Sequence, residues 1–291
     1  MKIIKKMKNL RWLVFTIQTV IPFFIPFIFN IPEYLMAFSI KIIIVCIVGG
    51  LDLTIIYVIT ISEDEDKKVQ LRNKAARCAY SNVYKINEYK RDNFIKKVST
   101  NNPLYSESED DAKYCLKEIS HSFGNLISEI THIEKEYLEI AFIFHYKDTD
   151  YWTWATQKDG TMVTPLDEFV KISSTVFYQL INPDVDGKLK TVIFYNDKEK
   201  MARDGLYYLS TRDNRHNNIG SILGIKSAFS TNDKILIEGI LVISTYGKRF
   251  IGDADELKVN DFQRLIIDDL FPCYQRMIET ELGILYYEKN N

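Results

Sequence analysis

The sequence is short of residues that interrupt regular structure. Its 291 residues include only 12 glycines and 7 prolines, and it shows no internal repeat of about 20–50 residues, which excludes a linker-rich or repeat architecture. Lysine and arginine number 37 against 39 aspartates and glutamates. Because this balance lacks the strong basic excess of a general nucleic-acid binder, we expect no general nucleic-acid binding. A content of 46% hydrophobic and 26% charged residues also excludes a disordered chain.

The sequence also lacks the motifs of catalysis and of metal binding. It contains no phosphate-binding glycine loop, no GxSxG nucleophile motif and no HExxH pair. The four cysteines and four histidines show no metal-ligand spacing, so free thiols are the simplest interpretation. We therefore expect no enzyme, no catalytic residue, no metal site and no cofactor.

Two long apolar runs stand at the N-terminus. Trp12 to Pro32 contains no charged residue, and Tyr34 to Ser62 follows almost at once. Each is long enough, at about 1.5 Å per residue, to cross a hydrocarbon core of about 30 Å. The runs predict a two-helix transmembrane hairpin over residues 1–62, with helices at about 10–31 and 34–62. A cleaved signal peptide is the alternative for the first run.

The charges that flank these runs predict an orientation. Basic residues precede the first run and follow the second, so the positive-inside rule places both termini in the cytoplasm. The expected location is the inner (plasma) membrane, crossed more than once, with the lipid bilayer as a partner. Lys41 and Asp52 interrupt the second run. They indicate either a polar face lined by other subunits, or a lysine that reaches the outer headgroups and an aspartate near the inner interface.

Residues 63–104 predict a connector, helical to about Val98, with Val69, Ala76 and Val83 at heptad spacing. The next helix is expected from about Ser108 to Glu136. Its apolar residues step alternately by four and three, which is typical of a helix seam that meets a partner. This pattern predicts a homodimer or higher homo-oligomer whose interface contains Leu116, Ile119, Phe123, Leu126 and Ile130.

From Leu138 the apolar period changes to two, which predicts strands. Strands are expected at Leu138 to Tyr146, Tyr151 to Thr156, Leu189 to Tyr195 and Leu206 to Leu209, and in a hairpin of Ile219 to Phe229 with Lys234 to Thr245. Thr164-Pro165 predicts the start of a helix that reaches about Leu180. A last amphipathic helix is expected from about Glu256 to Tyr287.

This order of elements over residues 105–291 resembles a GAF domain, with the related PAS architecture as the competitor. The residues that carry the resemblance are Gly220-Ser221-Ile222-Leu223-Gly224-Ile225, Ile237 to Ser244, Phe250 and the terminal helix. Ile225-Lys226 stands where the family usually has proline. The expected fold class is therefore a transmembrane hairpin joined to an α+β (GAF/PAS-like) antiparallel-sheet cytoplasmic domain with flanking helices.

The resemblance implies a small ligand, often a cyclic nucleotide, held between the sheet and the variable segment, here residues 196–220. Arginines suit phosphate, and aromatic rings suit a base. The alternative is a solvated loop with ordinary tyrosine packing. The expected ligand-binding residues are Arg203, Tyr207, Arg212, Arg215, His216 and, on a neighbouring strand, Trp154.

Two functions follow from these patterns. The first is a membrane-anchored sensor or effector that binds a nucleotide-like ligand and acts through the hairpin, by analogy with membrane-disrupting effectors of bacterial antiviral defence. The second is a membrane-tethered protein-interaction or adaptor module with no small-molecule ligand. A sensor predicts an open, basic site, whereas an adaptor predicts that the same region is filled by its own side chains.

Overall fold

The computed structural model describes residues 25–26, 28–32, 34, 37–99, 109–155, 165–232, 234–252 and 256–290. The chain forms two compact units, Met1–Gln70 and Leu71–Asn291. Helix α3 (Phe38–Ser99) belongs to both, since it begins in the first unit and ends in the second.

The predicted transmembrane hairpin is wrong. Among the described residues, none of the helices combines the length and the apolar character that crossing a bilayer requires. The second apolar run does not end as a separate span at Ser62, because α3 continues without a break through the charged residues 63–68 to Ser99. The same finding contradicts the expected multi-pass location in the inner membrane. The first predicted helix falls largely outside the described residues.

Lys41 lies near the start of α3, and its side chain meets its own chain. Its Nζ donates hydrogen bonds to the carbonyl oxygens of Phe29, at 3.1 Å, and of Ile31, and the residue is buried. These bonds satisfy carbonyl groups at the end of the preceding helical turn. Asp52 also lies in α3, but its side chain is outside the described part.

The second unit is built on an antiparallel sheet of five strands in the order β2-β1-β5-β4-β3. The strands are β1 (Leu138–Tyr146), β2 (Thr153–Trp154), β3 (Val192–Tyr195), β4 (Ile222–Thr231) and β5 (Lys234–Thr245). The antiparallel sheet with flanking helices that the alternating pattern predicts is therefore present. The β4–β5 hairpin turns at Asn232, whose φ of 44° is a left-handed conformation that asparagine tolerates.

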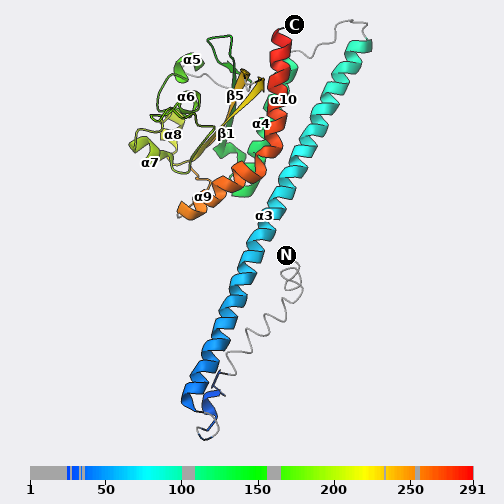
Figure 1. The fold of residues 1–291 in the computed structure, drawn as a ribbon. Helices are drawn as coiled ribbons and strands as arrows, with labels where there is room; N and C mark the ends of the chain where they lie inside the picture. Colours follow the sequence, from blue (N-terminus) through cyan, green and yellow to red (C-terminus); the bar gives the residue numbers. More distant parts are fainter. Residues whose placement is uncertain are drawn as a thin grey trace. The chain divides into compact units, whose positions relative to one another are not determined.

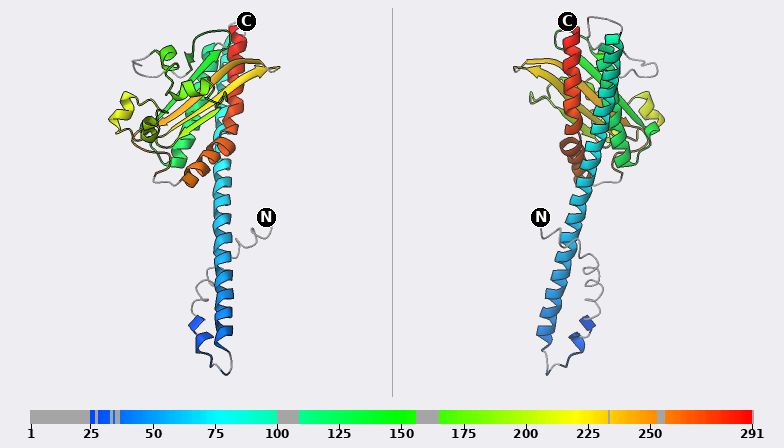
Figure 2. Two further views of the ribbon diagram at one scale, coloured as in Figure 1. Left: turned by 60° about the vertical axis from the view of Figure 1, so that its left-hand side comes forward. Right: turned by 90° about the vertical axis from the view of Figure 1, so that its right-hand side faces the viewer.

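Two helices cover one face of the sheet, α4 (Glu109–Thr131) and α10 (Pro272–Lys289), and the C-terminal part of α3 joins the same core on their outer side (Figures 1 and 2). Gly239 of β5 allows close packing here, since a Cβ at this position would lie 2.6 Å from the ring of Phe142. The residues expected at a subunit interface lie in this core within one chain. Leu116, Ile119, Phe123 and Leu126 are buried, and Ile130 packs against them.

Short helices cover the opposite face: α5 (Leu166–Phe169), α6 (Val176–Ile181), α7 (Lys198–Arg203) and α8 (Thr211–Arg215) (Figure 1). The single helix expected up to Leu180 is broken in two, because Thr175 caps α6 by accepting a hydrogen bond from the Tyr178 backbone N–H at 3.1 Å. Leu206 to Leu209 is not a strand; it is an irregular segment that leads into α8.

The expected terminal helix is also interrupted. It consists of α9 (Glu256–Arg264), a π-helical turn η2 (Leu265–Leu270) and α10. Pro272 has no backbone N–H and its ring crowds the preceding turn, so the helix widens there. The Phe271 N–H accordingly donates to the Ile266 carbonyl, five residues back, at 2.8 Å.

Candidate binding site

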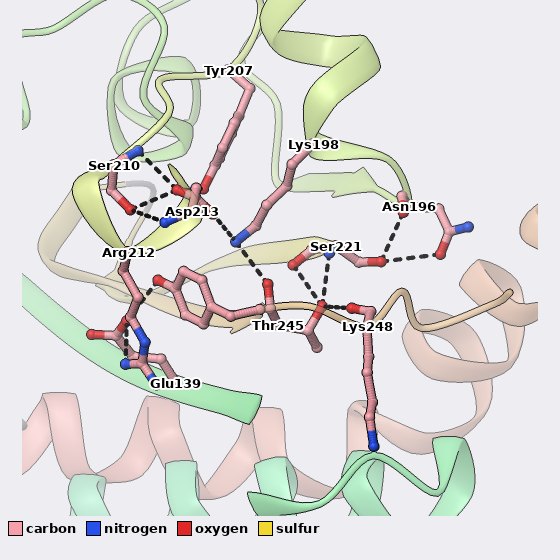
Figure 3. A network of polar contacts seen from close by, with 11 residues as sticks. Glu139, Asn196, Lys198, Tyr207, Ser210, Arg212, Asp213, Ser221, Thr245 and Lys248 are labelled. Atoms are coloured by element: carbon pink, nitrogen blue, oxygen red, sulfur yellow. Dashed lines mark hydrogen bonds and ion pairs between the residues drawn. The ribbon is translucent and has the colours of Figure 1, made fainter. Parts of the chain in front are cut away.

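A buried polar cluster lies where α7 and α8 meet the ends of β4 and β5 (Figure 3). Its centre is Lys198, which is fully buried at the start of α7. The Lys198 Nζ donates to Asp213 Oδ1 at 2.7 Å and to the Thr245 carbonyl at 2.9 Å. Gly220 allows the backbone at Thr245 to approach closely, since a Cβ at position 220 would lie 2.2 Å from the Thr245 carbonyl oxygen and 3.2 Å from Cδ of Lys198.

Asp213 is held by its own helix as well as by Lys198. Its Oδ2 accepts hydrogen bonds from the backbone N–H and the hydroxyl of Ser210, at 2.8 and 2.6 Å. The Tyr207 hydroxyl donates to the same oxygen at 3.2 Å. Ser210 and Asp213 form a capping box that fixes the first turn of α8. The buried carboxylate therefore has a donor for each oxygen.

Burial and charge both shift the titration of this cluster. Burial lowers the pKa of Lys198, and the neighbouring Asp213 carboxylate opposes this by raising it. Burial also raises the pKa of Tyr207 well above its ordinary value, and the charge of Asp213 adds to the effect. Tyr207 therefore remains a hydrogen-bond donor, and the amine of Lys198 is occupied by a carboxylate and a carbonyl rather than offered to a substrate.

A second set of hydrogen bonds extends the cluster toward the loop after β5 (Figure 3). Thr245 Oγ1 accepts from the Ser221 backbone N–H at 2.7 Å and donates to the Lys248 carbonyl at 2.6 Å. The Ser221 hydroxyl donates to the Asn196 carbonyl and accepts from the Phe250 N–H, both at 2.8 Å. These bonds connect the segment after β3, the residue before β4 and the loop after β5.

Arg212 of α8 faces the start of β1. Its guanidinium group bonds Glu139 Oε2 at 3.2 Å and lies 4.3 Å from the centre of the Tyr246 ring. The Tyr246 hydroxyl donates to the same Glu139 oxygen at 2.7 Å. About two fifths of the Arg212 side chain is exposed. Arg212 is therefore partly accessible to solvent, but Glu139 already provides its counter-charge.

The structure brings together only part of the predicted ligand site. Tyr207 and Arg212 belong to the cluster, and the His216 ring lies 6.0 Å from that of Tyr246. Arg203 and Arg215 are exposed residues of α7 and α8.

Trp154 lies elsewhere, in β2, where it packs edge-on against Phe177 of α6. Lys198 lies in the predicted window but was not among the expected binding residues, and Asp213, Glu139 and Thr245 were missed. The spacing of Ser210 and Asp213 carried a readable signal, because it matches a capping box; the partners of Lys198 and Arg212 depend on the tertiary fold.

The chain's own side chains fill the sheet face beneath the short helices. Ile143, Leu180 and Ile240 are fully buried there. Gly224 lets α6 approach the sheet, since a Cβ at this position would lie 2.4 Å from Val176 and 2.9 Å from Leu180. A row of contacting aromatic rings completes this core: Trp154, Phe177, Phe169 and Tyr208.

A separate charged cluster lies on β1, β4 and β5. Glu238 is buried and is paired with Lys147, at 2.5 Å, and with Lys226, at 2.8 Å. Burial raises the pKa of Glu238, but the hydrogen bonds and charges of the two lysines outweigh it, so the pKa is lowered overall. His145 stacks on Trp152 beside this carboxylate. Here too the buried charge is compensated within the chain.

Within the described ranges, the side chains that commonly bind metals form no group of three or more suited to an ion. Comparison with known proteins finds no matching family model, curated protein or solved structure. The candidate site therefore has to be judged from its own geometry.

Proposed function

We propose that the chain is a non-catalytic protein-interaction module with no small-molecule ligand. The observation that carries this proposal is the occupied state of the predicted ligand region. The sheet face beneath α5–α8 is packed with aliphatic and aromatic side chains, and Lys198 and Arg212 are paired with Asp213 and Glu139. A region filled in this way supports an adaptor rather than a ligand sensor.

The energetics of the buried pair support the same conclusion. An anionic ligand that recruited Lys198 would have to break its contact with Asp213 and leave that carboxylate buried without its counter-charge. Removing one partner of a buried pair costs about 3–5 kcal/mol. A ligand would have to repay this cost before any net binding appeared.

The test is native mass spectrometry of the full chain with a panel of cyclic mono-, di- and trinucleotides. We expect the mass of the unliganded protein across the whole panel. A nucleotide adduct that survives purification, or that forms on incubation, would overturn the proposal.

A small-anion sensor is the second candidate, and the partial exposure of Arg212 favours it. A phosphate that replaced Glu139 would leave that carboxylate its hydrogen bond from Tyr246, and the exposed Arg215 lies three positions further along α8. If an adduct is found, Arg212→Ala combined with Arg215→Ala should abolish it. An adduct retained by this double variant would exclude both arginines as its binding site.

A further inference from the structure

The part of α3 in the second unit has two faces with different environments. One face is part of the domain core, where Ala75, Ala79 and Ile86 are buried. Polar contacts lie along the two edges of this face: Tyr89 donates to Asp111 at 2.7 Å, and Lys90, two turns beyond Val83, pairs with Glu281 at 3.1 Å. These contacts fix which side of the helix is left outside.

The other face carries what we call the outer stripe: Asn73, Ala76, Tyr80, Val83 and Asn87, with Tyr84 beside it. All six residues are exposed. The two tyrosines are the most open of these side chains, at 74% exposed for Tyr80 and 61% for Tyr84, whereas Val83 is 37% exposed. The stripe residues step by three, four, three and four, which is the spacing of a two-helix seam. A seam on α4 has the same spacing, but its side chains are buried within one chain.

We propose that the outer stripe pairs with the outer stripe of a second copy of this chain, in parallel and in register. This inference rests on the proposed function, because it names the partner of the interaction module. In a parallel pair each residue meets its own counterpart. The seam then has two alternating kinds of layer: one kind is formed by Asn73, Tyr80 and Asn87, and the other by Ala76 and Val83.

The composition of the stripe favours a second copy over an unrelated partner. An asparagine at this kind of layer bonds its counterpart across the seam, and it specifies a two-stranded, in-register pair at some loss of stability. Ala76 lets the two backbones approach. In an in-register pair, each asparagine forms its hydrogen bond with the same asparagine of the second copy. A surface that pairs with itself in this way is self-complementary, as a two-fold interface requires.

The area of the stripe is sufficient for a weak, specific dimer. A tyrosine buries about 150–250 Å² when it is fully covered, and Tyr80 and Tyr84 have most of their surface available. With the valine, the alanine and the two asparagines, each copy offers on the order of 500 Å². Two copies therefore bury at most about 1,000 Å², which is the lower bound for a specific interface.

The first test is the molar mass of the full chain by sedimentation or light scattering across a concentration series. We expect a dimer that dissociates on dilution. Val83→Asp should weaken dimerisation at least about tenfold, since it places two carboxylates opposite each other in the seam. Ser81→Asp is the matched control: this exposed position is one residue on from Tyr80, about 100° further around the helix, and it should leave dimerisation unchanged.

The second test concerns orientation and remains informative if a charged variant misfolds. In a chain with Cys46→Ser, Cys78→Ser and Cys273→Ser, in which the remaining Cys115 is buried, oxidation should cross-link Val83→Cys to its counterpart but not Ser81→Cys. Equal cross-linking at both positions, or a monomeric wild-type chain, would overturn the seam. A nucleotide adduct would instead overturn the proposed function, so the two failures can be told apart.

Discussion

Removing the Asp213 carboxylate should be among the most damaging single changes to this fold. Asp213→Ala leaves Lys198 fully buried without its counter-charge, and it deprives Ser210 and Tyr207 of their acceptor. It also removes the capping box of α8. Because this helix has only five residues, it has little stability of its own to offset the loss.

The magnitude follows from the burial of the pair. Breaking a buried ion pair by deleting one partner costs about 3–5 kcal/mol in the free energy of unfolding. Replacing both partners with apolar residues of similar size costs much less, because no uncompensated charge remains. Lys198→Met combined with Asp213→Leu should therefore be more stable than Asp213→Ala alone.

The loss should also depend on pH. Burial already lowers the pKa of Lys198 below its unfolded value, and loss of Asp213 lowers it further because this carboxylate raises it. Between the folded and the unfolded pKa the unfolded chain binds more protons, so stability rises with pH. The destabilisation of Asp213→Ala should therefore be largest near neutral pH and should shrink as the pH rises toward the unfolded lysine pKa of about 10.4.

Urea unfolding followed by circular dichroism, at about pH 7 and about pH 9.5, measures both effects. The matched control is Asp204→Ala, which removes an exposed aspartate at the end of α7 and should be nearly neutral. A loss below about 1 kcal/mol for Asp213→Ala, or a double variant that is no more stable than the single one, would refute the assignment of a buried, ionised pair.

Three further predictions concern packing and charge. Gly224→Ala should cost about 1–3 kcal/mol through overpacking, whereas Gly252→Ala, where nothing lies within 4 Å of the new Cβ, should be neutral; equal unfolding midpoints would contradict this. Phe123→Ala should cost about 3–5 kcal/mol, and His121→Ala, at an exposed position of the same helix, far less. Glu238 stabilises the fold above its unfolded pKa of about 4.3, and this stabilisation is lost as the pH falls through its lowered folded pKa. The free energy of unfolding of Glu238→Gln should therefore fall less steeply on acidification than that of the wild-type chain. Parallel acid-unfolding curves for the two proteins would argue against this.

The sheet was largely predictable because its signal is local. β1 follows the alternating pattern from Leu138 to Tyr146, and the hairpin was expected within three residues of β4 and at the bounds of β5. The amphipathic spacing of α4 was also readable. What the spacing does not specify is whether the facing helix comes from the same chain, and here α10 and α3 supply it.

The errors arose where apolar spacing alone predicted an element that a capping residue or a proline interrupts, or that the neighbouring sequence extends. Thr175 and Pro272 each interrupt a helix that apolar spacing alone would continue. The apolar run after Tyr34 satisfied the length of a membrane span, yet α3 extends it into a charged helix that ends only at Ser99.

Two cations of residues 196–220, Lys198 and Arg212, show why a basic loop is weak evidence for an anion site. A cation is available to a ligand only if the fold leaves it without a counter-charge, and the counter-charges here come from far along the sequence: Asp213 lies 15 residues from Lys198, and Glu139 lies 73 residues from Arg212. With 39 acidic residues against 37 basic ones, the chain contains at least one carboxylate for every lysine or arginine. In a chain with this balance, internal pairing is the first expectation for a buried or half-buried cation, and a ligand site requires a cation that the folded chain has left uncompensated.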